Sequence, residues 1–145
     1  MHIEQLQEIT DAVPALISYV DRKLQYQYCN HAYSEWFGLP REQIMGRPMV
    51  DVLGAEAMRP ILPHLERALG GQVSDFEVEL AYERGGTRWI HAVYTPHRDE
   101  HGDVVGIVVL VTDISERKRW EGEFQRERAR LSMALTAGSM GVFDW

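Results

Sequence analysis

Hydrophobic and polar residues follow a spacing along this chain that changes several times. From Ile3 to Val13 the apolar positions recur every three or four residues, which predicts a short amphipathic helix over residues 1–11. Pro14 ends that pattern because its ring removes a backbone N–H and restricts the backbone. We therefore expect the chain to open with a helix that has one apolar face.

Two runs rich in Tyr, Val and Ile follow, over residues 15–20 and 24–29. These residue types fit the pleated surface of a sheet. Only Asp21, Arg22 and Lys23 separate the two runs, and a connection this short predicts a hairpin.

Helical spacing returns after the hairpin. Asn30 is a good helix N-cap, and Ala32 to Phe37 follow a helical pattern that Gly38 ends. Residues 41–45 predict one further turn.

A longer helix is predicted over residues 55–69, where the apolar positions form one stripe. Pro60 and Pro63 fall inside it. Because proline disfavours a helix interior, we expect an irregular start, with regular helix beginning near these prolines.

Strand patterns dominate the next part of the chain. Residues 74–82 alternate between apolar and polar, residues 88–95 form a second run, and Gly85-Gly86 predicts the turn between them. A turn over residues 99–102 precedes residues 104–112, which are mostly β-branched and predict a central strand. Hairpin connections of this kind indicate one antiparallel sheet with helices on one face, which is the α+β class.

Charge dominates the segment that follows, since ten of the fifteen residues from 116 to 130 are charged. Opposite charges lie three or four positions apart, as in Arg117 and Glu121, and this spacing predicts a solvated helix. Trp120, Phe124 and Leu131 add a thin apolar stripe suited to contact with a second helix.

Composition narrows the class of function. A length of 145 residues suits one ordinary domain, and a net charge of −7 argues against binding to nucleic acid or to an anionic membrane. Cys29 is the single cysteine, which predicts a reducing, cytoplasmic setting. No apolar run reaches the ~20 residues that a membrane span needs.

A series of short motifs resembles the PAS domain over residues 12–118. Its members, in chain order, are Tyr28-Cys29-Asn30-His31-Ala32, Gly46-Arg47-Pro48, Gly85-Gly86-Thr87-Arg88-Trp89, Pro96-His97-Arg98-Asp99 and Asp113-Ile114-Ser115-Glu116-Arg117-Lys118. The third motif departs from the family pattern, because Gly85 replaces the usual Asp.

The resemblance implies a PAS-like five-stranded antiparallel sheet with short helices on one face, flanked by N-terminal and C-terminal helices. It places a PAS domain over residues 12–115, after the helix over 1–11, and a charged helical linker over 116–131. Residues 132–145 resemble the opening of a second, truncated PAS domain, as in a tandem sensor protein.

The resemblance also implies an interior that can enclose a small, mostly apolar metabolite with a few polar groups. The family pattern and strand alternation point these side chains inward: Leu16, Ser18, Val20, Gln27, Cys29, Tyr33, Phe37, Ile61, Leu65, Ile107, Val109 and Val111. The alternative is that the same residues simply fill the core of a ligand-free dimerisation and interaction module.

Signal output is expected at the end of the last strand, through Asp113, Ile114 and Ser115. Asp113 and Ser115 can cap the charged helix, and Ile114 can anchor it. The resemblance implies a downstream output domain of the histidine kinase or diguanylate cyclase class in the same chain.

The outward face of the sheet is expected to carry an aromatic patch that supports a homodimer. Its members would be Tyr26, Tyr28 and alternate residues of the late strands such as Trp89 or Tyr94, covered by the N-terminal helix of the same or a second copy.

Cofactors and catalysis are argued against residue by residue. A flavin-binding member needs a reactive cysteine in the helix over 41–45 and a Gln at position 111, and neither is present. The position that matches a haem ligand holds Ile61, and His64 is interpreted as an exposed helix residue. The His and Asp residues of the hairpin from His97 to Asp103 are split between faces, so no metal site is expected. The chain has no phosphate-binding glycine loop and no paired catalytic carboxylates, so this segment is predicted not to be an enzyme.

Overall fold

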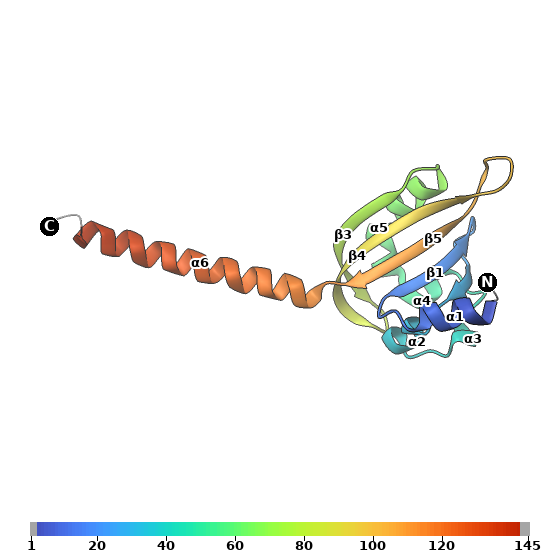
Figure 1. Cartoon of the computed structure of the whole chain (residues 1–145), viewed down its shortest axis with the longest axis horizontal. Helices are drawn as coiled ribbons and strands as arrows, with labels where there is room; N and C mark the ends of the chain where they lie inside the picture. Colours follow the sequence, from blue (N-terminus) through green and yellow to red (C-terminus); the bar gives the residue numbers. More distant parts are fainter. Residues whose placement is uncertain (1–2, 143–145) are drawn as a thin grey trace. The chain divides into compact units, whose positions relative to one another are not determined.

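Five antiparallel strands form one sheet in the spatial order β2-β1-β5-β4-β3 (Figure 1). In the computed structural model, the backbone is described for residues 3–142 and the side chains for residues 5–131. The strands are β1 (Leu16–Asp21), β2 (Tyr26–Cys29), β3 (Ser74–Tyr82), β4 (Gly86–Arg98) and β5 (Val104–Asp113). The predicted fold class and the central place of the last strand are therefore confirmed.

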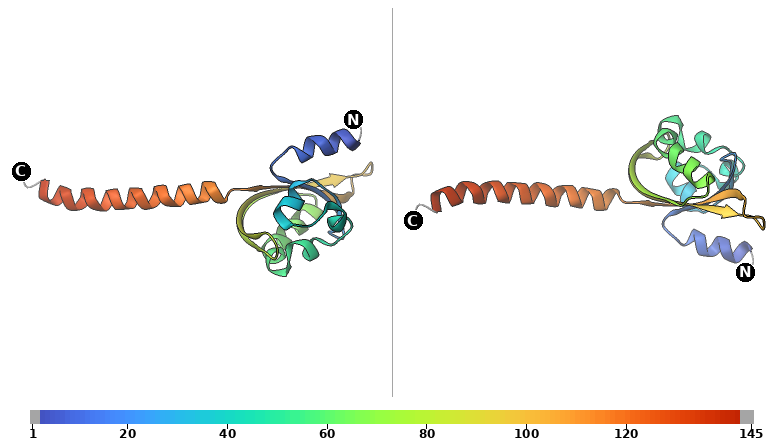
Figure 2. Two further views of the ribbon diagram at one scale, coloured as in Figure 1. Left: turned by 90° about the horizontal axis from the view of Figure 1, so that it is seen from below. Right: turned by 90° about the horizontal axis from the view of Figure 1, so that it is seen from above.

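Helices lie on both sides of this sheet. Four of them fill the curved inner face, namely α2 (Ala32–Phe37), α3 (Arg41–Ile44), α4 (Met49–Leu53) and α5 (Ala55–Leu69). The N-terminal helix α1 (Ile3–Asp11) lies across the opposite, outer face (Figure 2). The sheet therefore encloses its core on one side only, between its inner face and α2 to α5.

Strand β5 occupies the middle of the sheet and pairs with both neighbours. Val109 lies opposite Ser18 of β1 and Tyr94 of β4. Residues 107, 109 and 111 are buried on the inner face, whereas Val108 and Leu110 are exposed on the outer face. Strand β5 therefore contacts the core through residues 107, 109 and 111 and is hydrogen-bonded to a strand on each side.

A β-bulge in β2 reverses the predicted orientation of two side chains. Tyr19 pairs with Tyr28, but Val20 pairs with Tyr26, so Gln27 has no partner residue across the ladder. One extra residue shifts the alternation by one position and sends the following side chains to the other face. Tyr26 is consequently buried and Gln27 exposed, which is the opposite of what alternation predicted.

The longest inner helix also differs from its prediction. Helix α5 begins at Ala55 and includes both Pro60 and Pro63, so the expected irregular start is wrong. Both prolines lie on the exposed side of the helix, where water can satisfy the carbonyls that lose their N–H donors. The sequence pattern also missed the short helix α4.

The chain divides into two compact units, Met1–Asp113 and Ile114–Trp145. The second unit contains one helix, α6 (Ser115–Val142). Its predicted ion pairs Arg117–Glu121 and Arg130–Glu127 are present, and Trp120 is exposed. The predicted start of a second domain falls on residues 132–145, whose side chains lie outside the described part. Among the described residues, no helix combines the length and hydropathy needed to cross a membrane.

Candidate functional site

The interior of the first unit holds most of the residues expected to face a ligand. Eleven of the twelve are buried: Leu16, Ser18, Val20, Cys29, Tyr33, Phe37, Ile61, Leu65, Ile107, Val109 and Val111. Gln27 is the exception, since it lies on the surface and donates to Asp21. Burial brings the eleven together, and their role as ligand contacts stays a prediction.

Aromatic rings form a connected cluster across this interior. The ring of Tyr33 contacts Tyr26 edge-on at 5.3 Å between centroids and lies 5.8 Å from Phe37. Phe37 in turn meets Tyr82 edge-on at 5.2 Å. Edge-to-face contacts of this kind stabilise the packing and limit rotation of each ring.

Two buried hydroxyl groups differ in their hydrogen bonding. The Tyr33 hydroxyl donates to Ser18 Oγ at 2.8 Å. The Tyr26 hydroxyl is fully enclosed and interacts with the Tyr33 hydroxyl beside it, which adds to the effect of burial on its pKa. Burial raises the pKa of both tyrosines, so each keeps its proton and remains a donor.

Asn30 is a structural centre that the sequence pattern misassigned. It was predicted to cap α2, but its side chain makes no cap there, and His31 occupies that position. Its amide nitrogen donates to the carbonyls of Thr10 and Ala15, and its Oδ1 accepts from the N–H of Ile17. One buried side chain thus joins the end of α1 to β1.

Cys29 is enclosed within the core. Burial raises the pKa of its thiol to about 11, although the neighbouring Arg41 guanidinium acts in the opposite direction. Arg41 is a cation that sequence reasoning did not place there; it also pairs with Asp11 at the end of α1. The thiol stays protonated, because desolvation outweighs the nearby positive charge.

A cation lies at the end of the sheet where β5 finishes. Arg88 Nη1 donates to Asp113 Oδ2 at 2.7 Å, and its Nε donates to the carbonyl of Gly85 at 3.0 Å. The guanidinium lies over the ring of Trp36, 4.2 Å from its centroid. These contacts, here called the Arg88 clamp, connect α2, the β3–β4 turn and the last residue of β5.

The three expected relay residues are consecutive at this point. Asp113 ends β5, Ile114 is buried, and Ser115 begins α6. The first turn of α6 is joined to Ile114 by the hydrogen bond from Lys118 N to the Ile114 carbonyl. Arg88 and Trp36 were missing from the predicted relay, because only the folded sheet brings them to Asp113.

The outer face of the sheet carries an apolar surface that differs in part from the predicted aromatic one, in which Tyr28 and Trp89 are half-buried. Tyr26 and Tyr94 are buried in the core, which corrects their predicted exposure. The exposed apolar side chains are instead Val108 and Leu110 on β5, together with Leu6 and Ile9 on α1. We call these four residues the outer apolar surface.

The last residues of helix α1 bond to the rest of the domain. Thr10 Oγ1 bonds to the Tyr28 hydroxyl, and Asp11 accepts from Arg41. Leu6 is 45% exposed and Ile9 53% exposed, so the apolar side of this helix does not cover its own sheet.

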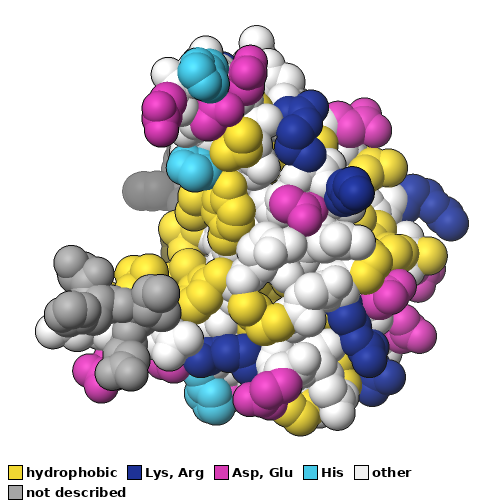
Figure 3. All heavy atoms as spheres, turned by 90° about the vertical axis from the view of Figure 1, so that its right-hand side faces the viewer, with side chains coloured by type: hydrophobic (Ala, Val, Ile, Leu, Met, Phe, Trp, Pro, Cys, Tyr) yellow, Lys and Arg dark blue, Asp and Glu magenta, His cyan; other side chains and the backbone are white. Residues whose placement is uncertain are grey.

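The clusters of acidic and histidine side chains do not form a set of metal ligands within the described residues. At the tip of the β4–β5 hairpin, where acidic and histidine side chains gather, Asp99 caps the turn by accepting from the N–H groups of His101 and Asp103 (Figure 3). His97 bonds to Tyr19 on the outer face. Within residues 5–131, no group of three metal-binding side chains is present.

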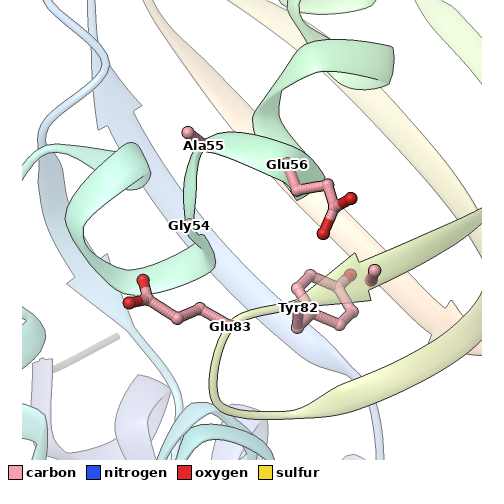
Figure 4. Close-up of a pocket in the computed structure, with 6 residues that line it drawn as sticks. Gly54, Ala55, Glu56, Tyr82 and Glu83 are labelled. Carbon is pink, nitrogen blue, oxygen red and sulfur yellow. The ribbon is translucent and has the colours of Figure 1, made fainter.

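Two further positions bring polar and aromatic side chains together. A surface hollow beside Gly54 is lined by Glu56, Tyr82 and Glu83, but the two carboxylates point away from each other (Figure 4). His64, interpreted from the sequence as exposed, is half-buried; it stacks on Phe76 at 3.6 Å and bonds to Ser74.

This architecture is a curved antiparallel sheet that encloses short helices and continues into a further helix, which defines a small α+β domain. Residues 10–119 match the family described as "PAS fold", and the chain belongs to that family. The crystal structure of the PAS domain of a protein from Colwellia psychrerythraea superposes with a TM-score of 0.66 at 21% identity, covering 79% of this chain and 98% of that one.

Two curated relatives are signalling proteins. The methanogenesis regulatory histidine kinase FilI of Methanothrix harundinacea (strain 6Ac) is 29% identical over 142 residues, covering 98% of this chain and 16% of that protein. The probable diguanylate cyclase DgcE of Escherichia coli (strain K12) is 24% identical over 123 residues, covering 83% and 11%. The chain thus spans 11–16% of the length of these relatives.

Proposed function

We propose that this PAS domain senses a signal in its tyrosine-lined interior and passes it through β5 and the Arg88 clamp into α6. The output domain would be of the histidine kinase or diguanylate cyclase class, as in the two relatives. The observation that carries the proposal is the position of β5, which lines the core, lies at the centre of the sheet and ends at the clamped Asp113.

The mechanism is a shift between two populations of the domain. Phe37 packs in the core beside Tyr33, and its neighbour Trp36 lies under the Arg88 guanidinium. A change of packing around Phe37 would move Trp36 and so bias the Arg88–Asp113 bond. Since α6 begins at Ser115, two residues after Asp113, the two states of that bond would present α6 differently to the output domain.

A small molecule in the interior is the proposed signal. The support for this reading is the group of buried hydroxyls on Ser18, Tyr26 and Tyr33 among apolar side chains, since polar groups inside a core can bond to a ligand that enters it.

Homodimerisation is the second proposed property. Leu6, Ile9, Val108 and Leu110 are between 40% and 53% exposed. Large apolar side chains exposed to this extent on one face of a domain are typical of protein contacts. A second copy would cover the outer apolar surface by a two-fold arrangement, in which each α1 packs against the partner's sheet.

A chimera tests the relay. This chain replaces the matching 142-residue segment of the histidine kinase FilI, and autophosphorylation is measured for the wild-type chimera and for Asp113→Ala. We expect an active kinase whose output Asp113→Ala shifts strongly, and Asp75→Asn, at the far edge strand, serves as the matched control. Equal output from all three chimeras would contradict the proposal.

A further inference from the structure

Thr10, in the last turn of α1, is bonded to both residues that flank Cys29 in the chain. Its Oγ1 bonds to the Tyr28 hydroxyl, and its carbonyl accepts from Asn30 Nδ2 at 2.8 Å. Tyr28 and Asn30 immediately precede and follow Cys29, whose side chain is 0% exposed. The end of the helix therefore holds the residues on each side of a buried thiol.

Asp11, the last residue of α1, reaches the same place through its charge. Its carboxylate pairs with Arg41 at the start of α3 and accepts from the His31 N–H at 2.8 Å. The Arg41 guanidinium in turn donates to the Cys29 thiol. One cation from α3 is therefore shared between a carboxylate on α1 and a thiol in the core.

These attachments of α1 are polar and partly open to water. The Arg41 and Asp11 side chains are 25% and 32% exposed, so the ion pair contributes modestly to stability. Leu6 and Ile9 are 45% and 53% exposed, so these two side chains bury little apolar surface against the domain. The helix has nine residues, too few to be stable alone in water. An attachment of this kind can open at a much lower free energy than the core behind it.

We propose that α1 is a detachable helix, whose release is controlled by the Asp11–Arg41 pair and loosens the core around Cys29 without unfolding the domain. Displacement of α1 would act on β2 through Tyr28 and Asn30, and on α3 through Arg41. This conformational input is separate from the Arg88 clamp at the end of β5, and it requires no ligand in the core.

The charges around Cys29 provide a test by sign. Burial has the largest effect and raises the pKa of the thiol, the Arg41 guanidinium lowers that pKa, and the Asp11 carboxylate raises it. If α1 stayed attached, Asp11→Asn would make Cys29 more reactive and Arg41→Gln would make it less reactive, since only the local charge would change. If α1 detaches, both variants break the same pair, and both should make Cys29 more reactive.

Labelling of Cys29 by iodoacetamide in the native full chain measures this opening, because Cys29 is the single cysteine. Rates at pH 8 are followed by mass spectrometry. We expect Asp11→Asn and Arg41→Gln each to react about 3- to 10-fold faster than the wild type. The double variant should react at a rate close to that of a single variant, since one pair is lost in all three. Glu8→Gln removes an exposed carboxylate from the same helix and should leave the rate unchanged.

The dependence of the labelling rate on urea separates release of α1 from global unfolding. Release of one short helix exposes little surface, so the rate should hardly change between 0 and 1 M urea. Labelling through global unfolding would instead accelerate about 5-fold or more over this range. Such an acceleration in the wild type and in both single variants would overturn the proposal.

Hydrogen exchange supplies a second measurement of the same event. The Ile17 N–H donates to Asn30 Oδ1, so its exchange should accelerate in Asp11→Asn together with the amides of α1. Slower labelling in Arg41→Gln than in the wild type, or a rate in Asp11→Asn equal to that in Glu8→Gln, would overturn the proposal. The kinase chimera with Asp113→Ala involves none of these contacts, so its result stands or falls independently.

Discussion

Arg88 on β4 and Asp113 at the end of β5 are joined by a hydrogen-bonded ion pair of 2.7 Å. Their side chains are 27% and 30% exposed, so water screens the pair only partly. Because Arg88 also lies over Trp36, the pair links the end of the sheet to a helix of the core. An ion pair of modest strength in this position is suited to a switch, since a small change in the free-energy difference between two states can break it.

A double-mutant cycle measures that contact. Arg88→Ala, Asp113→Ala and the double variant are unfolded in urea, and we expect a coupling free energy of about 1 kcal/mol between the two residues. Asp75→Asn, which breaks the pair with His91, is the control and should add independently. A coupling energy near zero would remove Arg88 from the relay.

Asn30→Ala should destabilise the domain by about 3 kcal/mol, because one N–H and two carbonyls each lose a buried partner. The neighbouring exposed residue supplies the control, since His31→Ala should change the free energy of unfolding by less than about 0.5 kcal/mol. Urea denaturation followed by circular dichroism gives both values. A loss of stability no larger than that of the control would show that these hydrogen bonds are replaced by water.

Cys29 should react slowly with iodoacetamide in the native state. Its pKa is raised from 9.0 to about 11, so at pH 8 the thiolate fraction falls about 100-fold before burial slows access further. Because the folded pKa lies above the unfolded one, the thiol contributes stability that is lost as the pH rises above the unfolded value. Mass spectrometry of timed samples measures the rate, with urea-unfolded protein as the reference. Native and unfolded rates that agree would contradict a buried thiol.

Leu110→Glu should dissociate the proposed dimer, because a carboxylate would be buried in the outer apolar surface. Val73→Glu changes a residue that is 52% exposed outside this surface, and it should leave the dimer intact. Sedimentation velocity over a range of concentrations measures whether each variant is a monomer or a dimer. A wild-type chain that stays monomeric at high concentration would end the dimer proposal.

Most of the sheet could be predicted from the sequence. Strand β3 follows strict alternation and was located with its observed bounds, and β5 was recognised as central because nearly all its residues are β-branched or apolar. Both patterns depend only on residues that are close in the sequence, so they predict the strands without knowledge of the fold.

Errors occurred where a position depends on a distant partner. The bulge at Gln27 is set by pairing with β1, and no local pattern around Tyr26 reveals it. The outward residues of the late strands were predicted to include Trp89 or Tyr94, which lie five positions apart and so on opposite faces, and the structure buries Tyr94. The Arg88 clamp joins three elements far apart in the chain, so it became visible only in the folded domain.

Hydrogen exchange of the full chain tests the relay most directly. Amides at the end of β5 and in the first turn of α6, from Val111 to Arg119, are compared in wild type, Arg88→Ala and Asp75→Asn by mass spectrometry. The account predicts exchange about 5-fold faster or more over this segment in Arg88→Ala, as expected for the loss of about 1 kcal/mol of local stability, and no change in Asp75→Asn. Identical exchange in all three proteins would contradict a signal that passes from the core through Arg88 to α6.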